Sequence, residues 1–321
     1  MRRYLAGRLL QTATVLLGLS LLVFALLVWT PGDPVELLAT ANPEVTPADV
    51  QRLRQYYGLD DPLLVRYLKW LRAVSRGDLG YSRTYGIPVR DLLAQRLRNT
   101  LLLAGTAFLL ALAGGTAAGI YSALRQYSPA DYGITVLSFV GLAIPNFWQG
   151  ILSILVFAVW IPLFPPGGMA TPGIVSGWPA LLDRLWHLAL PVSVLATSGA
   201  AAWARYVRSS LLEVIHQDYV RTARAKGLSE ARVIGQHALR NALLPVITLV
   251  ALAIPGVVNG AVLTETVFSW PGMGLLLYQA VLGHDLNVAM AVLLLLAVVT
   301  VAANLLADVA YALVDPRVRY G

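Results

Sequence analysis

The chain has few charged residues and no cysteine. Only 13% of its 321 residues are Asp, Glu, Lys or Arg, whereas 57% are hydrophobic. Soluble domains carry about 25% charged residues. Charges this sparse cannot cover the surface of a soluble domain, so the composition predicts a chain that buries its apolar surface in lipid. The absence of cysteine excludes disulfides and cysteine-ligated metals, and it leaves the compartment open.

Motifs of enzymes are missing as well. The sequence contains no Gly-x-x-x-x-Gly-Lys-Ser/Thr, no His-Glu-x-x-His and no Gly-x-Ser-x-Gly, and its only lysines are Lys69 and Lys226. These absences argue against ATP hydrolysis by this chain and against an intramembrane enzyme. The four histidines border apolar runs or lie in loops, which makes a metal cluster a poor interpretation. We therefore expect no catalytic residue, metal or cofactor on this chain; a channel is the other rival class.

Six runs without Asp, Glu, Lys or Arg approach or exceed the 20 or so helical residues that cross a bilayer. They are Leu9–Trp29, Thr100–Leu124, Tyr132–Phe164, His187–Ala204, Asn241–Thr264 and Leu286–Ala307. These runs predict an all-α polytopic membrane protein with six transmembrane helices. The first run is too long for a signal peptide and lacks a small-residue cleavage site, so we expect a retained anchor. The third is long for one span, and we expect Pro145 to kink it.

Basic residues are distributed unevenly among the loops. Arg2, Arg3 and Arg8 precede the first span, and six Arg and one Lys lie between the fourth and fifth, against three acids. The positive-inside rule then predicts that both termini and this loop are cytoplasmic, in the cytoplasmic (inner) membrane of a bacterium or archaeon. The same asymmetry accounts for the formal net charge of +7, without a nucleic-acid partner.

Residues 31–99, between the first two spans, are predicted to form an extracytoplasmic helical insertion. Thr46, Pro47 and Asp49 predict a helix start, Asp61-Pro62 predicts another, and Gly77–Gly80 reads as a turn. The second helix has an apolar face and a basic face. The apolar residues are Leu63, Leu64, Tyr67, Leu68 and Leu71, and the basic ones are Arg66, Lys69 and Arg72. The insertion caps the spans or docks an external partner, and these interpretations are compatible.

The stretch DYVRTARAKGLSEARVIGQHALRNALLP, residues 218–245, is basic and helix-permissive, although it lies between two apolar runs. We expect a helix over Leu211–Lys226, a left-handed turn at Gly227, a second helix capped by Ser229, and a cap at Asn241 for the next span. Small residues make this hairpin thin near its turn, and basic residues make it cationic. A thin, cationic hairpin of this kind suits an acidic groove on another protein. The alternative is a basic loop that binds anionic lipid, although lipid binding requires neither small residues nor helix caps.

This stretch resembles the EAA loop of bacterial ABC importer permeases, with Arg221-Thr222-Ala223 in place of Glu-Ala-Ala and Gly227 in place of the motif's glycine. The full run to Pro245 is similar to the dipeptide/oligopeptide/nickel branch, and the chain resembles a DppB-type subunit. Further segments agree with that branch. They are Thr30–Pro34, Tyr57–Asp60, Gly77–Gly80, Ile144–Trp148, Glu265–Gly272 and Asp315–Arg317.

The resemblance implies partners for this chain. A second homologous permease would complete the translocation pathway, two cytoplasmic ATPases carrying ATP and Mg would bind the loop, and an extracytoplasmic substrate-binding protein would deliver the substrate; membrane lipid surrounds the spans. The expected ATPase-coupling residues are Arg221, Thr222, Ala223, Arg224, Ala225, Lys226, Gly227, Leu228, Ser229 and Glu230. Peptides are the expected substrates, with nickel chelates, glutathione or another small solute as alternatives.

Polar residues within the spans are candidates for the translocation pathway, because polar groups in a bilayer are costly without a partner or water. They are Asn146, Trp148, Gln149, Asn259, Thr264, Glu265, Asn304 and Asp308. Packing or helix–helix hydrogen bonding is the alternative for each. Gly115 and Gly119 form a small-x-x-x-small pattern, which predicts close helix packing. Three parts are expected: the anchor 1–30, the insertion 31–99 and the transmembrane core 100–321, with its EAA-type loop at 211–245.

Overall fold

A computed structural model of the chain describes residues 2–29, 46–56, 60–174, 176–259 and 261–314. All named elements in these ranges are helices, which confirms the all-α class; the one isolated bridge joins Tyr81 and Pro88. The chain divides into two compact units. The first comprises Met1–Arg96 and Leu276–Val299, and the second comprises Leu97–Leu275 and Thr300–Gly321. Each unit is described by itself.

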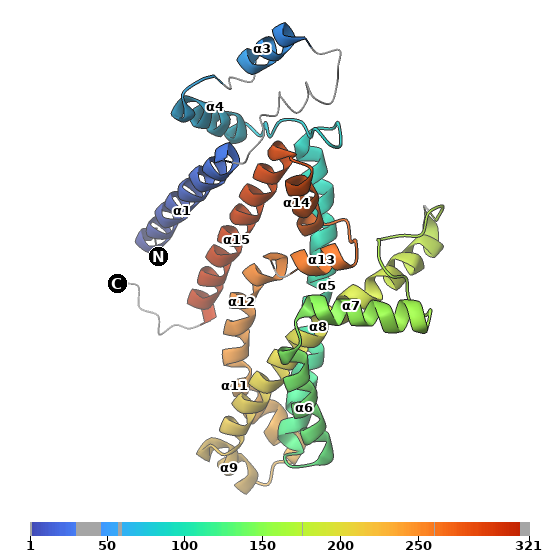
Figure 1. Cartoon of the computed structure of the whole chain (residues 1–321). Helices are drawn as coiled ribbons and strands as arrows, with labels where there is room; N and C mark the ends of the chain where they lie inside the picture. The colour runs from blue at the N-terminus through green and yellow to red at the C-terminus, as the bar shows by residue number, and fades with distance from the viewer. Residues whose placement is uncertain (1, 30–45, 57–59, 175, 260, 315–321) are drawn as a thin grey trace. The chain divides into compact units, whose positions relative to one another are not determined.

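The first unit is built on α1 (Arg2–Trp29), α3 (Pro47–Tyr56), α4 (Leu63–Ser75), most of α14 (Met273–Leu282) and the first half of α15 (Leu286–Val314) (Figure 1). An aromatic and aliphatic core joins α1, α4 and α15 through Phe24, Tyr67 and Met290. The Tyr67 and Ser20 hydroxyls lie 2.8 Å apart within this core, so the buried phenol has a partner. Other parts of the chain bury only part of the predicted apolar face of α4, since Leu64 and Leu68 are exposed.

Both predicted helix starts in the insertion are confirmed, with different chemistry. The Asp49 N–H donates to the Thr46 hydroxyl (3.3 Å) and the Thr46 N–H donates to Asp49 (3.1 Å), which is a reciprocal cap for α3. Hydrogen bonds from Thr46 also lower the pKa of Asp49. At α4, Asp61 provides no cap and instead accepts from Lys69 Nζ (2.6 Å). The predicted turn is present, with positive φ at Gly77 and Gly80.

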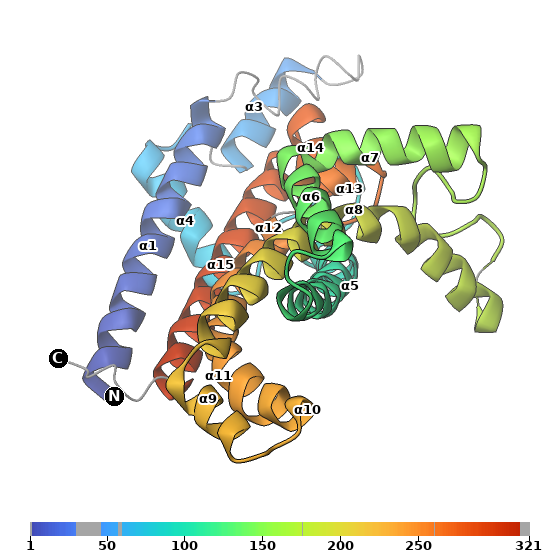
Figure 2. The same cartoon turned by 90° about the horizontal axis from the view of Figure 1, so that it is seen from below.

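The second unit contains the remaining helices around α8. They are α5 (Val89–Leu124, which begins in the first unit), α6 (Pro129–Ala143), α7 (Asn146–Ile154), the π-helix η1 (Leu155–Trp160), α8 (Gly177–Ile215), α9 (Asp218–Ala225), α10 (Glu230–Arg232), the π-helix η2 (Val233–Leu239), α11 (Arg240–Ala242), α12 (Leu244–Asn259) and α13 (Val262–Val267). Figure 2 shows α9, α10 and α11 grouped beyond one end of α8.

Glycines bring α5 and α8 into close contact, as the small-x-x-x-small pattern predicts. A Cβ added at Gly115 would lie 2.6 Å from the Ala200 carbonyl oxygen, and one at Gly119 would lie 2.5 Å from that of Ala204. From the other side, a Cβ at Gly199 would lie 2.8 Å from the Ala111 Cβ. These distances are shorter than van der Waals contact, so a methyl group at any of the three positions would push the helices apart.

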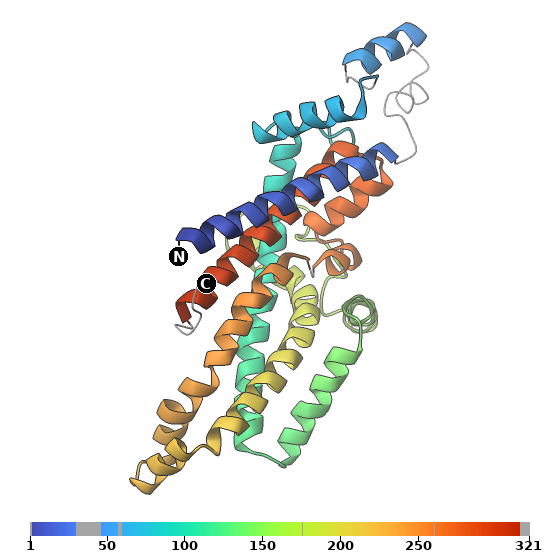
Figure 3. The ribbon, with the colours of Figure 1, turned by 90° about the vertical axis from the view of Figure 1, so that its left-hand side faces the viewer.

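The chain bends sharply at Pro145, where α6 ends and α7 begins. The angle between α6 and the α7–η1 arm is 101°, so Figure 3 looks along the arm while α6 runs across the view. Proline lacks the N–H that would bond to the Gly141 carbonyl. Gln149 Nε2 replaces this donor, at 3.2 Å from Gly141 O and 2.9 Å from Ile144 O. The predicted kink is therefore present, and it is larger than a bend within one continuous helix.

Three described helices are long and apolar enough to cross a membrane: Val89–Leu124, Gly177–Ile215 and Leu286–Leu306. Two bent pairs pass the same test when each pair is taken as one span, namely Pro129–Ala143 with Asn146–Trp160 and Glu230–Ala242 with Leu244–Ile254. The first predicted span corresponds to a shorter apolar stretch of α1, Leu10–Ala25. The membrane class of the chain therefore has structural support, whereas the count of six spans stays a prediction.

Candidate coupling hairpin and translocation pathway

The predicted hairpin is present as α9, a turn at Gly227, and a second arm made of α10, η2 and α11. Gly227 has a φ of +75°, in the left-handed region that a residue with a Cβ adopts only at a cost. Three details of the prediction are wrong. The helix expected over Leu211–Lys226 is broken at His216, where α8 ends. Ser229 precedes α10 without a side-chain cap bond, and Asn241 donates to the His237 carbonyl instead of capping the next span.

Apolar side chains hold the hairpin against the ends of α5 and α8. Leu211, Val220, Val233 and Ala238 have essentially no exposed surface and form one cluster with Ala123, Ala223, Ile234 and Ala242. Ala223 therefore packs inside the hairpin, and its small size is explained by the chain's own packing. Ala225 and Gly227 are exposed at the turn, as a thin tip requires.

Acids partner two of the three cations expected at the tip. Arg224 Nη2 lies 2.8 Å from Glu230 across the turn, and Arg221 Nη1 lies 3.4 Å from Asp218 within α9. The Arg224–Glu230 pair ties the two arms together, although exposed ion pairs are weak and sensitive to salt. Lys226 is also exposed. The tip is thus less cationic than its Arg and Lys residues alone suggest.

The other predicted coupling residues have local roles. The Thr222 hydroxyl donates to the Asp218 carbonyl (2.9 Å), and Leu228 packs against the apolar cluster from the turn. Ser229 and Glu230 are exposed. All ten predicted coupling residues therefore lie on one continuous hairpin, and its contact with an ATPase stays a prediction.

Glu265, a predicted pathway residue, is completely buried in the second unit. Its Oε1 accepts from the Thr100 hydroxyl (2.6 Å), and its Oε2 accepts from the backbone N–H groups of Gly274 (2.6 Å) and Leu275 (3.3 Å). The carboxyl group therefore sits at the N-terminal end of α14, where free N–H groups favour an acid. Gly272 and Gly274 line this cradle: a Cβ on Gly272 would collide with the carboxyl group, and one on Gly274 would collide with Val262 Cα and lie 3.0 Å from Glu265 Oε2. This geometry holds the segment between α13 and α14 in place.

The remaining pathway candidates are only partly brought together. Gly150 of α7 packs against Val267 and Phe268, which joins the Asn146–Gln149 segment to the segment that carries Glu265. Trp148 is exposed, Asn146 is half-buried, and Gln149 supports the bend. Thr264 is buried, and its hydroxyl has no hydrogen-bond partner among the described residues. Asn304 is exposed on α15, while the side chains of Asn259 and Asp308 lie outside the described set.

A buried ionic cluster lies beside the hairpin and was not predicted from the sequence. It is formed by Ser122, Asp131 and Arg208. Its only sequence signal is Ser128-Pro129-x-Asp131, a pattern typical of a helix start. A cavity of about 510 Å³ on the adjoining part of α8 was also missed. It is lined by Leu142, Ala202, Arg205, Tyr206, Ser209, Ser210, Glu213 and Pro245.

Comparison with known proteins identifies the class to which this hairpin and these membrane helices belong. Residues 115–320 match the family "Binding-protein-dependent transport system inner membrane component", and residues 1–104 match the N-terminal family of such membrane components. The chain therefore belongs to the inner-membrane components, or permeases, of binding-protein-dependent ABC transport systems. This family provides transport subunits, as distinct from enzymes.

Curated relatives match the chain over its whole length. It is 46% identical over 321 residues to the oligopeptide transport system permease protein AppB of Bacillus subtilis (strain 168), with 100% of both chains covered. It is 38% identical to the di/tripeptide transport system permease protein DppB of Pseudomonas aeruginosa (strain UCBPP-PA14), covering 100% of this chain and 99% of that one. Among solved structures, an inward-facing form of the methionine ABC transporter MetNI shares the fold, with TM-score 0.51, 16% identity, and coverage of 68% of this chain and 96% of that one.

The conformation and openness of Gly227 allow its two properties to be tested separately. A Cβ at Gly227 meets no atom of this chain within 4 Å, so backbone strain is the main internal cost of Gly227→Ala, roughly 1–2 kcal/mol. Gly227→Asn adds bulk at a position whose left-handed backbone Asn tolerates better. If the turn enters a groove on an ATPase, Gly227→Asn and Gly227→Val should abolish co-purification of the ATPase, while Gly227→Ala should only weaken it.

Gly235→Ala is the matched control, because Gly235 lies on the same hairpin, also faces open space and has no positive φ. It should leave co-purification unchanged. Normal ATPase binding by Gly227→Asn and Gly227→Val would show that no groove encloses the turn, and would favour the lipid-binding alternative.

Proposed function

We propose that this chain is the permease subunit of an ATP-driven importer of peptides and forms half of the translocation pathway. The observation that carries the proposal is the full-length similarity to proteins named as oligopeptide and di/tripeptide permeases, together with a hairpin whose glycine turn is exposed. Nickel chelates, glutathione or another small solute are the alternative substrates within the same class.

The chain requires partners for this function. Its sequence has no phosphate-binding motif, so ATP and Mg would be held by two cytoplasmic ATPase subunits that contact the hairpin. A second homologous permease would complete the pathway, and an extracytoplasmic binding protein would deliver the substrate. The exposed side chains of α4, Leu64 and Leu68 among them, are available for contacts with lipid or with these partners.

We propose six spans in the inner membrane, with both termini and the hairpin in the cytoplasm and the α3–α4 insertion outside. The Arg and Lys distribution supports this orientation. Because the chain has no native cysteine, single cysteines report on topology without competition. In intact cells, an impermeant thiol reagent should label Arg72→Cys and should not label Lys226→Cys until the membrane is opened. Labelling of both positions from outside would contradict the proposed topology.

The cavity along α8 is a candidate for the cytoplasmic part of the pathway. It combines a cation, an anion and hydroxyl groups, from Arg205, Glu213, Tyr206 and Ser209, with apolar wall atoms. Arg205 lies 4.8 Å from the centre of the Phe139 ring, a contact that orients its guanidinium. Such a lining suits a substrate that has two charged ends and a backbone of donors and acceptors, as a short peptide has.

Reconstitution of the complete transporter in vesicles tests the function. With its binding protein and ATP present, it should take up labelled di- and oligopeptides, and these should stimulate ATP hydrolysis. Arg205→Gln should lower uptake at saturating binding protein without lowering assembly. ATP-dependent uptake of nickel chelates or glutathione in place of peptides would overturn the peptide assignment, and ATP-independent conduction would overturn the importer assignment.

A further inference from the structure

Asp131 is the centre of a buried polar cluster that joins three helices. It lies in the first turn of α6, and its side chain is 4% exposed. Arg208 of α8 binds it in a bidentate manner, with Nε 2.8 Å from Oδ1 and Nη2 2.9 Å from Oδ2. The Ser122 hydroxyl of α5 donates to Oδ1, and the Tyr127 N–H donates to Oδ2 (3.0 Å). Each carboxylate oxygen thus accepts two hydrogen bonds, one from Arg208 and one from Ser122 or Tyr127.

This ion pair restricts the relative position of α6 and α8 more than the surrounding apolar packing does. Apolar contacts are non-directional, whereas a bidentate Arg–carboxylate pair fixes the orientation of its two groups and so restricts the relative position of the two helices. Elsewhere α6 meets α8 through small groups at Gly141, where a Cβ would lie 3.4 Å from Ala201 Cβ and Thr197 Cγ2, and through the exposed Phe139 ring, which lies 4.8 Å from the Arg205 guanidinium. The small groups offer little resistance to sliding and the Phe139–Arg205 contact is exposed, so the buried ion pair is the contact that restricts the register of α6 on α8.

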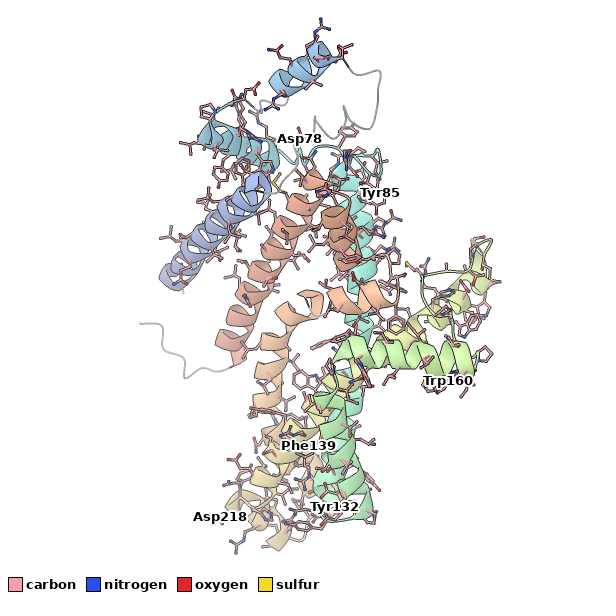
Figure 4. All side chains as sticks on the ribbon, viewed as in Figure 1. Asp78, Tyr85, Tyr132, Phe139, Trp160 and Asp218 are labelled. Carbon is pink, nitrogen blue, oxygen red and sulfur yellow. The ribbon has the colours of Figure 1, made fainter. Side chains whose placement is uncertain are left out.

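The same two helix ends carry the hairpin. Ala123 follows Ser122 in α5, and Leu211 lies one turn after Arg208 in α8; both belong to the apolar cluster that holds α9 and η2. In the described part of the chain, that cluster includes no residue of α6. Tyr132 at the start of α6 and Asp218 at the start of α9 lie toward the same end of this unit (Figure 4). The ionic cluster therefore connects α6 to the support of the hairpin.

We propose that Asp131 and Arg208 are positioning residues for energy coupling. By locking α6 to the helix ends that hold the hairpin, they carry a displacement of the hairpin to the bend at Pro145, where α6 passes into α7. This inference rests on the proposed function, since it supposes that an ATPase moves the hairpin. Neither residue contacts a substrate; they act through α6.

Arg208→Lys tests the proposal because lysine keeps the positive charge and cannot form the bidentate pair. In reconstituted transporter, ATPase co-purification and ATP hydrolysis should stay near wild type, while peptide transported per ATP hydrolysed should fall about tenfold, within the usual range of coupling energies. Arg125→Lys is the matched control: Arg125 follows the end of α5, beside this cluster, and is exposed. It should leave the ratio unchanged.

If Arg208→Lys impairs assembly, Ser122→Ala tests the positioning role of the cluster instead. It keeps the ion pair but removes the hydroxyl that donates to Asp131 and accepts from Arg208 Nε (3.1 Å). Transport per ATP should then fall roughly two- to threefold, with normal assembly. A wild-type ratio in the assembled variants, or a loss of hydrolysis equal to the loss of transport, would overturn the proposal. Absence of ATP-dependent uptake by the wild-type transporter would instead overturn the proposed function.

Discussion

Gly115, Gly119 and Gly199 let the backbones of α5 and α8 approach until side-chain methyl groups no longer fit between them. Much of the second unit follows from this contact. It places Ser122 within reach of Arg208, one turn beyond Gly119, and it brings Ala123 and Leu211 together as a platform for the hairpin. In a bilayer, where apolar burial gives helices little drive to associate, such close backbone contact is a main source of helix–helix attraction.

At two breaks between helices, a side chain replaces the hydrogen bonds that the backbone loses. At Pro145 the lost N–H is replaced by the Gln149 amide, so the 101° bend leaves the Gly141 carbonyl bonded. At the start of α14, Glu265 accepts the N–H groups that a helix end leaves free. Gln149 and Glu265, which the sequence predicts as pathway residues, therefore also maintain the hydrogen bonding of the backbone, as a low-dielectric environment requires.

The helical class, the kink at Pro145, the turn at Gly227 and the α3 cap could all be predicted from the sequence, because each depends on local chemistry within a few residues. The burial of Ala223 and Glu265 could not, because it depends on partners far along the chain or across a turn. For the same reason, the Asp131–Arg208 pair, separated by 77 residues, gave no signal beyond a local helix start. The sequence also overstated the charge of the tip, since Glu230 and Asp218 fold back onto its arginines.

If Asp131 and Arg208 position α6 as proposed, the hairpin and α6 move as one body during transport. Spin labels at Gln236→Cys on η2 and Tyr132→Cys on α6 measure this directly, because both positions are exposed and the chain has no other cysteine. In the reconstituted transporter, the distance between the labels should be the same in the nucleotide-free and ATP-bound states, and Arg208→Lys should broaden its distribution. A change of more than about 2 Å between the two states in the otherwise native chain, beyond an ordinary helix shift, would show that the hairpin and α6 move separately.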